Sequence, residues 1–162
     1  MRVFQLRWLV LVLGLSILAG CGFQLRGQAD FDFDRVKRQG LDKVQMSRIM
    51  DMALTINGLE VNVGQSPVTL TLIDELRERS IVTFSATGRA REVRITYTLT
   101  FSVKDAKSDF LIADTSLTQQ RELTYSDEQI LGKEAEENRL FKEMQEDIAR
   151  QIVTRLGNVS LR

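Results

Sequence analysis

The fold is decided by residues 93–104, whose sequence is VRITYTLTFSVK. Every second position from Val93 to Val103 is apolar, and the positions between them carry Arg, Thr, Ser or Lys. Because successive side chains of a strand point to opposite faces, this alternation predicts a half-buried antiparallel strand. One face should lie on a core, and the other should face water or a polar partner.

Two neighbouring strands are expected. Residues 68–72 alternate in the same way, and Leu76, Val82 and Phe84 keep the same even parity further along the chain. This pattern predicts one strand over residues 68–84 whose even positions face the core.

The strand after residues 93–104 is expected over residues 110–123. In an antiparallel hairpin that turns between these two segments, residue n pairs with roughly residue 214 − n. This register places Arg91 near Leu123 and Arg94 near Gln120.

Two helices are also expected. The first spans about 10 residues, from Ser47 as N-cap to the stop signal at Asn57 and Gly58. The second runs from about residue 134 to residue 156, after a segment with the spacing of a capping box at 126–129. Its apolar positions recur every four residues, at Leu140, Met144, Ile148, Ile152 and Leu156. Gly157 should end it.

Three shorter segments complete the prediction. Residues 28–40 are interpreted as a charged linker whose two phenylalanines pack weakly, and residues 59–63 are interpreted as a short strand. The sequence leaves open whether residues 41–46 form a strand. Together the elements predict an α+β fold, with a mostly antiparallel four- to five-stranded sheet and two helices packed on one face. The other face should be rich in threonine, serine and charge.

The N-terminus has the layout of a bacterial export signal. Arg2 and Arg7 flank the start of an apolar run over residues 8–19, which is too short to cross about 30 Å of hydrocarbon. The sequence LAGC at residues 18–21 resembles a lipobox. In that motif, Cys21 receives a diacylglyceryl group, and after cleavage it becomes the N-acylated first residue. The alternative is an ordinary cleaved signal with an incidental cysteine.

Gly22 follows the lipidated position. In the sorting rule associated with this motif, aspartate there would retain the protein at the inner membrane, so glycine indicates the outer one. We therefore expect a lipid anchor in the inner leaflet of the outer membrane. The expected organisation is a cleaved lipoprotein signal peptide at 1–20, a lipidated N-terminus and tether at 21–40, and a single α+β domain at 41–162.

Composition argues against several classes of function. Two of the 22 basic side chains leave with the signal peptide, so the mature chain has two more acidic than basic side chains, unlike a nucleic-acid-binding protein. The chain has no histidine, which removes the usual general base and the commonest metal ligand. Its one cysteine is used by the lipid. We expect no catalytic residues, no metal site and no cofactor beyond that covalent lipid.

The chain resembles the LptE family of LPS-assembly lipoproteins, once called rare lipoprotein B. The residues that carry the resemblance are CGFQLRG at 21–27, the threonine-rich hairpin at 91–123, YSDEQILGKE at 125–134 and FKEM at 141–144. The stretch between residue 27 and the first helix is shorter than this family leads one to expect.

This resemblance implies a non-enzymatic role in outer-membrane biogenesis. Members of the family plug the large β-barrel LptD, assist its assembly and help to deliver lipopolysaccharide to the outer leaflet. A hydrated barrel lumen favours a plug that presents threonine, serine and charge. The expected position is thus the periplasmic side of the outer membrane and the lumen of the barrel. Plain exposure of the polar face to solvent is the alternative.

Lipopolysaccharide carries phosphates, which arginine binds well. From Arg79 to Arg94 the chain has four basic residues and one acidic residue. We therefore hypothesise that Arg89, Arg91 and Arg94 contact lipopolysaccharide or a partner, and the predicted register brings Arg121 close to them. An ordinary solvated turn is the alternative interpretation.

Two functions remain open from the sequence. The first is a plug and assembly factor for a lipopolysaccharide-exporting barrel, which requires a solid core and a large polar contact surface. The second is a periplasm-facing lipoprotein that binds or shuttles an amphiphile independently of a barrel, which requires a deep apolar cavity.

Overall fold

The computed structural model describes residues 31–42, 44–86, 88–124 and 130–161. The expected signal peptide, Cys21 and the capping box at residues 126–129 lie outside these residues.

The described residues form a five-stranded sheet with strand order β2-β1-β3-β4-β5. β3 is antiparallel to β4, and β4 is antiparallel to β5, whereas the short β1 runs parallel to both β2 and β3. The strands are β1 (Arg35–Gln39), β2 (Glu60–Val61), β3 (Val68–Phe84), β4 (Ala90–Asp105) and β5 (Phe110–Thr124).

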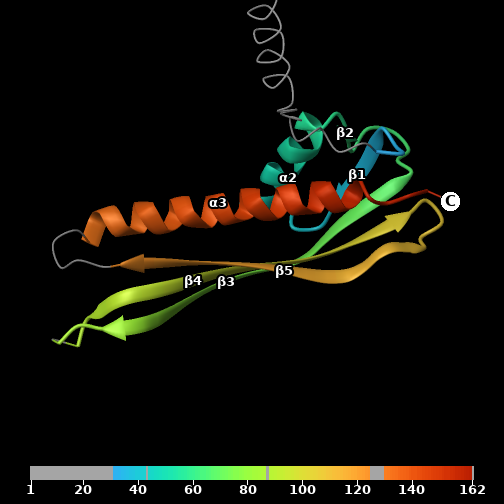
Figure 1. The fold of residues 1–162 in the computed structure, drawn as a ribbon. Helices are drawn as coiled ribbons and strands as arrows, with labels where there is room; N and C mark the ends of the chain where they lie inside the picture. The colour runs from blue at the N-terminus through green and yellow to red at the C-terminus, as the bar shows by residue number, and fades with distance from the viewer. Residues whose placement is uncertain (1–30, 43, 87, 125–129, 162) are drawn as a thin grey trace, which may run out of the picture.

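Two helices complete the fold, α2 (Gln45–Ile56) and α3 (Ile130–Leu156). Figure 1 shows α3 lying along the length of the sheet, with α2 beside its C-terminal half, on the same side. The α+β fold predicted from the sequence is therefore confirmed. No helix of the described part of the chain is long and apolar enough to span a membrane.

The core lies between β4 and α3. Tyr97, Leu99 and Phe101 on β4 and Met144 and Ile148 on α3 are fully buried. The apolar face of β4, which recurs every second residue, thus packs against the apolar face of α3, which recurs every fourth residue, as the sequence patterns predict. Burying so many large side chains is the main stabilising contribution to this fold.

β1 corrects the interpretation of residues 28–40 as a linker. Residues 35–39 form a strand between β2 and β3, and Val36 is fully buried. The strand was missed because Val36 is the only apolar residue among its five, so there is no alternation to detect. Phe33, just before it, is also buried in the core.

The described residues among 41–46, which the sequence left open as a strand, do not form one. Gly40 and Leu41 both have positive φ, at 78° and 48°, so the chain turns away from the sheet directly after β1. The N-cap of α2 is Val44, without a side-chain hydrogen bond, rather than Ser47. The Ser47 hydroxyl instead donates to the carbonyl oxygen of Val44 at 2.7 Å.

The strand expected at residues 59–63 is shorter than predicted, because β2 contains only Glu60 and Val61. Asn62 has a φ of 58°, which ends the extended conformation. The helix boundaries at the C-terminal side agree better with the prediction: α2 has Asn57 as C-cap, and α3 stops just before Gly157.

A β-bulge in β3 overturns the predicted parity of that strand. The register with β4 shifts between Leu72 and Asp74, so Ile73 is an extra residue. Beyond it, Arg77 pairs with the core-facing Tyr97, so the odd positions of β3 face the helices. Leu76 therefore lies on the helix-free face and is 47% exposed, contrary to the expectation that it would be in the core.

The register of β4 with β5 differs from the prediction by two residues. Arg94 pairs with Glu122 instead of Gln120. Near the turn, Lys104 pairs with Phe110 as predicted, but two register shifts between Phe101 and Lys104 displace the rest of the ladder. The extra residues are on β5, and the alternation of apolar and polar residues does not reveal them.

Candidate contact surface

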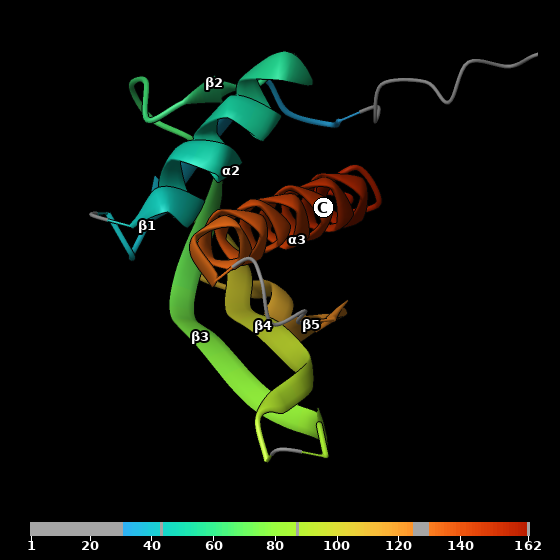
Figure 2. The same ribbon diagram turned by 90° about the vertical axis from the view of Figure 1, so that its left-hand side faces the viewer.

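The turn between β3 and β4 projects two arginines from the end of the sheet. It is closed by the Ser85 N–H, which donates to the Arg89 carbonyl oxygen at 2.7 Å, and by the Arg89 N–H, which donates to Ser85 Oγ at 3.1 Å. Gly88 has a φ of 75° in this turn, a conformation that favours glycine. Figure 2 shows this end of the hairpin curving away from α3.

Arg89 and Arg91 are both exposed at this end of the hairpin. Within the described residues, the Arg91 side chain makes no hydrogen bond or ion pair. A hairpin end that carries two exposed guanidinium groups suits recognition of phosphate or carboxylate groups.

Arg94 lies on the helix-free face of the sheet and has a partner on the neighbouring strand. Its guanidinium donates twice to one carboxylate oxygen of Glu122, at 3.1 and 2.7 Å. Both side chains are about half exposed, so this ion pair adds little stability. Arg94 can therefore exchange Glu122 for an anionic ligand at small cost.

Arg121 does not join this group. It pairs with Ile95 and so lies on the face that the helices cover, opposite to Arg94. Its guanidinium donates to Asp147 on α3 at 2.9 Å and to the Gln120 carbonyl oxygen at 2.9 Å. The predicted cluster of Arg121 with Arg94 is wrong, because residues that pair with core-facing positions of β4 lie on the helix-covered face. The predicted pairing of Arg121 with Val93 already implied that face, and the observed pairing with Ile95 keeps it. A ligand contact of Arg121 stays a prediction.

The helix-free face of the sheet is lined with hydroxyl groups, as its sequence predicts. Thr98 and Thr118 oxygens lie 3.0 Å apart, and the Thr100 and Ser116 oxygens lie 2.8 Å apart. These cross-strand pairs hold the β4 and β5 side chains in a fixed pattern. We refer to this face of β4 and β5 as the hydroxyl face.

A buried polar group lies on the other face, and the sequence did not reveal it. Gln145 on α3 donates to Glu75 Oε1 at 3.0 Å, and Arg77 donates twice to the same oxygen, at 3.1 and 2.9 Å. The Arg77 guanidinium also lies over the rings of Tyr97 and Phe141. This group fixes α3 on β3 directly after the bulge.

Two buried polar atoms of this region, the Tyr97 hydroxyl and Gln145 Oε1, have no hydrogen-bond partner among the described residues. Burial, and then the negative charge of Glu75, raise the pKa of Tyr97 above its usual value. The sequence shows Tyr97 as one apolar position among six, so neither effect could be predicted from it.

A second polar contact joins β1 to α2. The Arg38 side chain is 9% exposed and donates to Asp51 at 2.6 Å and to Asp42 at 2.7 Å. Burial lowers the pKa of Arg38, but the hydrogen bonds and charges of the two aspartates outweigh it, so the pKa is raised overall. The role of Arg38 is structural.

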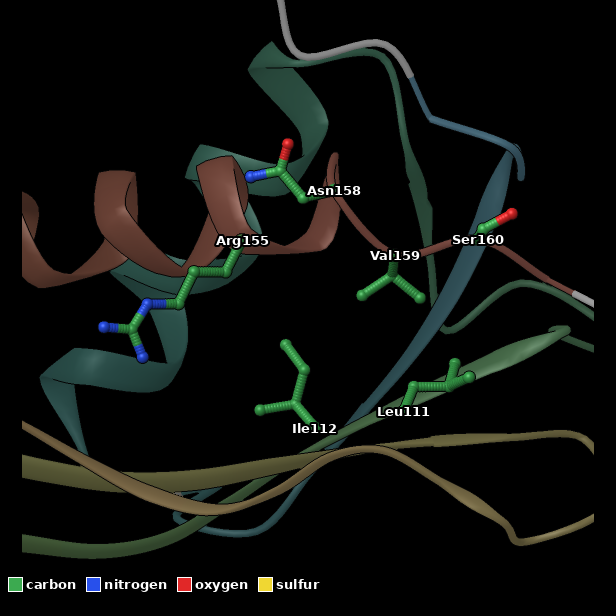
Figure 3. Close-up of a pocket in the computed structure, with 6 residues that line it drawn as sticks. All are labelled: Leu111, Ile112, Arg155, Asn158, Val159 and Ser160. Atoms are coloured by element: carbon green, nitrogen blue, oxygen red, sulfur yellow. The ribbon is translucent and has the colours of Figure 1, made fainter.

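A cavity of about 470 Å³ lies between the start of β5 and the C-terminal end of α3. Figure 3 shows Ile112 of β5 directed toward the end of α3, with Val159 and Arg155 on the other side. Its lining mixes polar and apolar side chains, and it is open to solvent at the edge of the molecule. It is not the deep apolar cavity that a shuttle requires. Within the described ranges, no three His, Cys, Asp or Glu side chains are placed to hold a metal ion.

Comparison with known proteins shows the family to which the chain belongs. A family model described as LptE, lipopolysaccharide-assembly, matches residues 25–156, which is most of the chain. The chain belongs to the LptE family. A relative from Photorhabdus laumondii, named LPS-assembly lipoprotein LptE, is 30% identical over 161 residues, covering 94% of this chain and 87% of that protein.

Solved structures agree with the family and the fold. The solution structure of lipoprotein B from Nitrosomonas europaea has a TM-score of 0.71 and 28% identity, covering 84% of this chain and 90% of that one. The crystal structure of rare lipoprotein B from Shewanella oneidensis has the same fold, with a TM-score of 0.68 and 21% identity over 76% of this chain and 94% of that one. The resemblance read from the sequence is confirmed. This LptE-family chain is an envelope-associated lipoprotein of lipopolysaccharide assembly, in a family of assembly lipoproteins rather than enzymes.

Proposed function

We propose that this protein is an outer-membrane lipoprotein that plugs the lipopolysaccharide-exporting barrel LptD, assists its assembly and helps deliver lipopolysaccharide to the outer leaflet. Lipid on Cys21 would anchor it to the inner leaflet, with the domain reaching into the barrel lumen. The observation that carries the proposal is the hydroxyl face, an ordered polar surface on a two-layer domain with a filled core. Such a face matches the hydrated wall of a barrel.

The arginines at the end of the β3–β4 hairpin supply the second part of the proposal. Arg89, Arg91 and Arg94 would contact phosphates of lipopolysaccharide or acidic groups of the lumen. Arg91 has no partner among the described residues, and Arg94 is held only by an exposed ion pair. Arginine binds phosphate through two parallel hydrogen bonds, which lysine cannot reproduce.

The amphiphile shuttle is less well supported. The described core between β4 and α3 is filled with fully buried side chains, and the cavity near Arg155 is open and partly polar. No observation favours the shuttle over the plug.

Co-purification tests the proposal. The tagged, lipidated chain is captured from solubilised outer membranes, and the bands that it retains are identified by mass. We expect a large β-barrel in equal stoichiometry. Recovery of the lipoprotein alone, or with only small lipids, would contradict the proposal and favour the shuttle.

Charge reversal then tests the arginines. Arg89→Glu with Arg91→Glu should reduce binding of purified lipopolysaccharide by about tenfold or more, because each lost phosphate contact is worth at least about 1 kcal/mol. The matched control is Arg139→Glu with Arg150→Glu, which changes the net charge by the same amount at two exposed positions on α3. Equal effects of the two variants would show that net charge alone matters.

A further inference from the structure

The half of β3 beyond its bulge has a free edge. β1 pairs with β3 only from Val68 to Thr71, and in the described part of the chain no strand continues on that side. β1 ends there because Gly40 and Leu41 take positive φ and turn the chain toward α2. Gly40 passes so close to β3 that a Cβ atom built on it would lie 2.1 Å from the Leu72 carbonyl oxygen. Along residues 73–84, the backbone groups that point away from β4 are therefore unpaired.

Exposed apolar side chains gather on this same segment. The described residues include nine exposed large hydrophobic side chains, and five of them lie within residues 73–84. Three are concentrated at the far end, where Ile81, Val82 and Phe84 are 44%, 43% and 61% exposed. Isolated surface hydrophobics are ordinary, but a group of this kind marks an interaction site.

From Asp74 to Ile81 the pairing of this segment with β4 is regular, and the segment contains no proline. Register shifts, which bend an edge strand and help to protect it, flank this stretch at Ile73 and between Ile81 and Phe84. Three of its five charged side chains are paired within the protein, Arg77 with Glu75 at 2.9 Å and Arg79 with Glu137 at 3.6 Å. Asp74 and Glu78 are exposed and make no ion pair among the described residues. Charges that are already paired do little to repel an incoming strand.

We propose that an extended segment of a partner protein adds to β3 as a new strand over residues 74–84. Its side chains would be mainly uncharged, and apolar ones would pack against Leu76, Ile81, Val82 and Phe84. An acyl chain would cover these side chains but leave the row of N–H and C=O groups unpaired. Only an added strand both covers these side chains and pairs the backbone groups of the β3 edge. This contact lies on the β1 side of the sheet, apart from the hydroxyl face of β4 and β5, and it does not depend on the plug proposal.

Hydrogen exchange followed by mass spectrometry tests this inference. The lipidated full-length chain is compared in two states: extracted natively from outer membranes with its partners, and purified alone. Strand addition should slow exchange of roughly half of the amides in residues 74–84 by at least about tenfold in the native extract, because only the outward-pointing amides gain partners. Exchange in α2 should change less.

Two variants make the test specific. Ile81→Lys with Val82→Lys should abolish the added protection, and Phe84→Lys alone should weaken it. The matched control is Met52→Lys with Ile56→Lys, which alters two side chains on α2 that are 65% and 68% exposed. The control should keep the protection of β3.

Three outcomes would overturn the inference. Exchange in residues 74–84 could be equally fast in both states. Protection of the purified chain that rises with its concentration would identify a second copy of this chain as the occupant. Protection by lipid-containing micelles without any protein partner would identify a lipid.

Discussion

Tyr97 and Gly40 show how single residues carry constraints that composition does not reveal. Tyr97 has the apolar alternation of its strand, but its hydroxyl is buried without a partner. Gly40 stands at the end of β1, where a φ of 78° and the nearby Leu72 carbonyl exclude a side chain. Each constraint gives a prediction about stability.

Replacing Tyr97 with phenylalanine should stabilise the protein by about 1 kcal/mol at neutral pH, because a buried, unpaired hydroxyl is removed. The raised pKa of Tyr97 means that its ionisation is disfavoured in the folded state. In the wild type, the stability that comes from keeping Tyr97 protonated in the folded state is fully present below the usual pKa of 10. It is lost as the pH rises through the raised folded pKa. Urea unfolding of both proteins between pH 7 and pH 11 measures this.

The difference between the two proteins should grow with alkaline pH, because only the wild type loses stability through Tyr97. A Tyr97→Phe protein that is less stable than the wild type at neutral pH would show that the hydroxyl has a partner after all.

Gly40→Ala should destabilise the fold by more than about 2 kcal/mol, because positive φ and a steric clash act together. Gly58→Ala is the matched control. Gly58 also has positive φ, at 88°, but nothing lies within 4 Å of the position that a Cβ atom would take there. The control should lose only about 1–2 kcal/mol. Thermal melting of the two variants measures the difference, and equal losses would refute the close approach to Leu72.

At the scale of elements, long periodic segments were predictable and short or irregular ones were not. β4 and α3 each repeat their pattern over many residues, and the predicted elements agree with those observed. β1 has one buried valine, Val36, among polar neighbours, so its pairing depends on tertiary contacts. The bulge at Ile73 reverses the faces of β3 without altering its composition, and this is why Leu76 was misplaced.

In the candidate contact surface too, features that depend on local sequence were predictable, and features that depend on contacts between distant residues were not. The arginines of the turn and the threonines of the hydroxyl face could be identified from the sequence, because both depend on local pattern. The exact partner of Arg121 on β4 could not, since two shifts in β5 displace the register by two residues. Its face could have been predicted, because both the predicted partner Val93 and the observed partner Ile95 face the core. The Glu75–Gln145 contact joins residues 70 apart in the chain.

Changing Thr98 and Thr118 to valine tests the hydroxyl face as an element. Valine has nearly the same shape and a high β propensity, so the free energy of unfolding should change by less than about 1 kcal/mol. Retention of the barrel in the co-purification should nevertheless fall several-fold, because polar lumen groups lose their partners. Unchanged retention would separate this face from partner binding.

At the scale of the whole molecule, a thin two-layer domain presents different chemistry on each side. α2 and α3 cover one side, the hydroxyl face forms the other, and the basic hairpin end projects beyond both (Figure 2). A domain with a filled core and three such surfaces is suited to be surrounded by partners rather than to enclose a ligand.

The most direct test of the plug is a photo-cross-linking residue placed at Gln120, an exposed position on the hydroxyl face, in the lipidated chain in intact cells. Illumination should yield one large adduct whose mass equals that of the chain plus an outer-membrane β-barrel, identified as LptD. Absence of any large adduct, with the chain folded and anchored in the outer membrane, would contradict the plug and leave the hydroxyl face as a surface exposed to solvent.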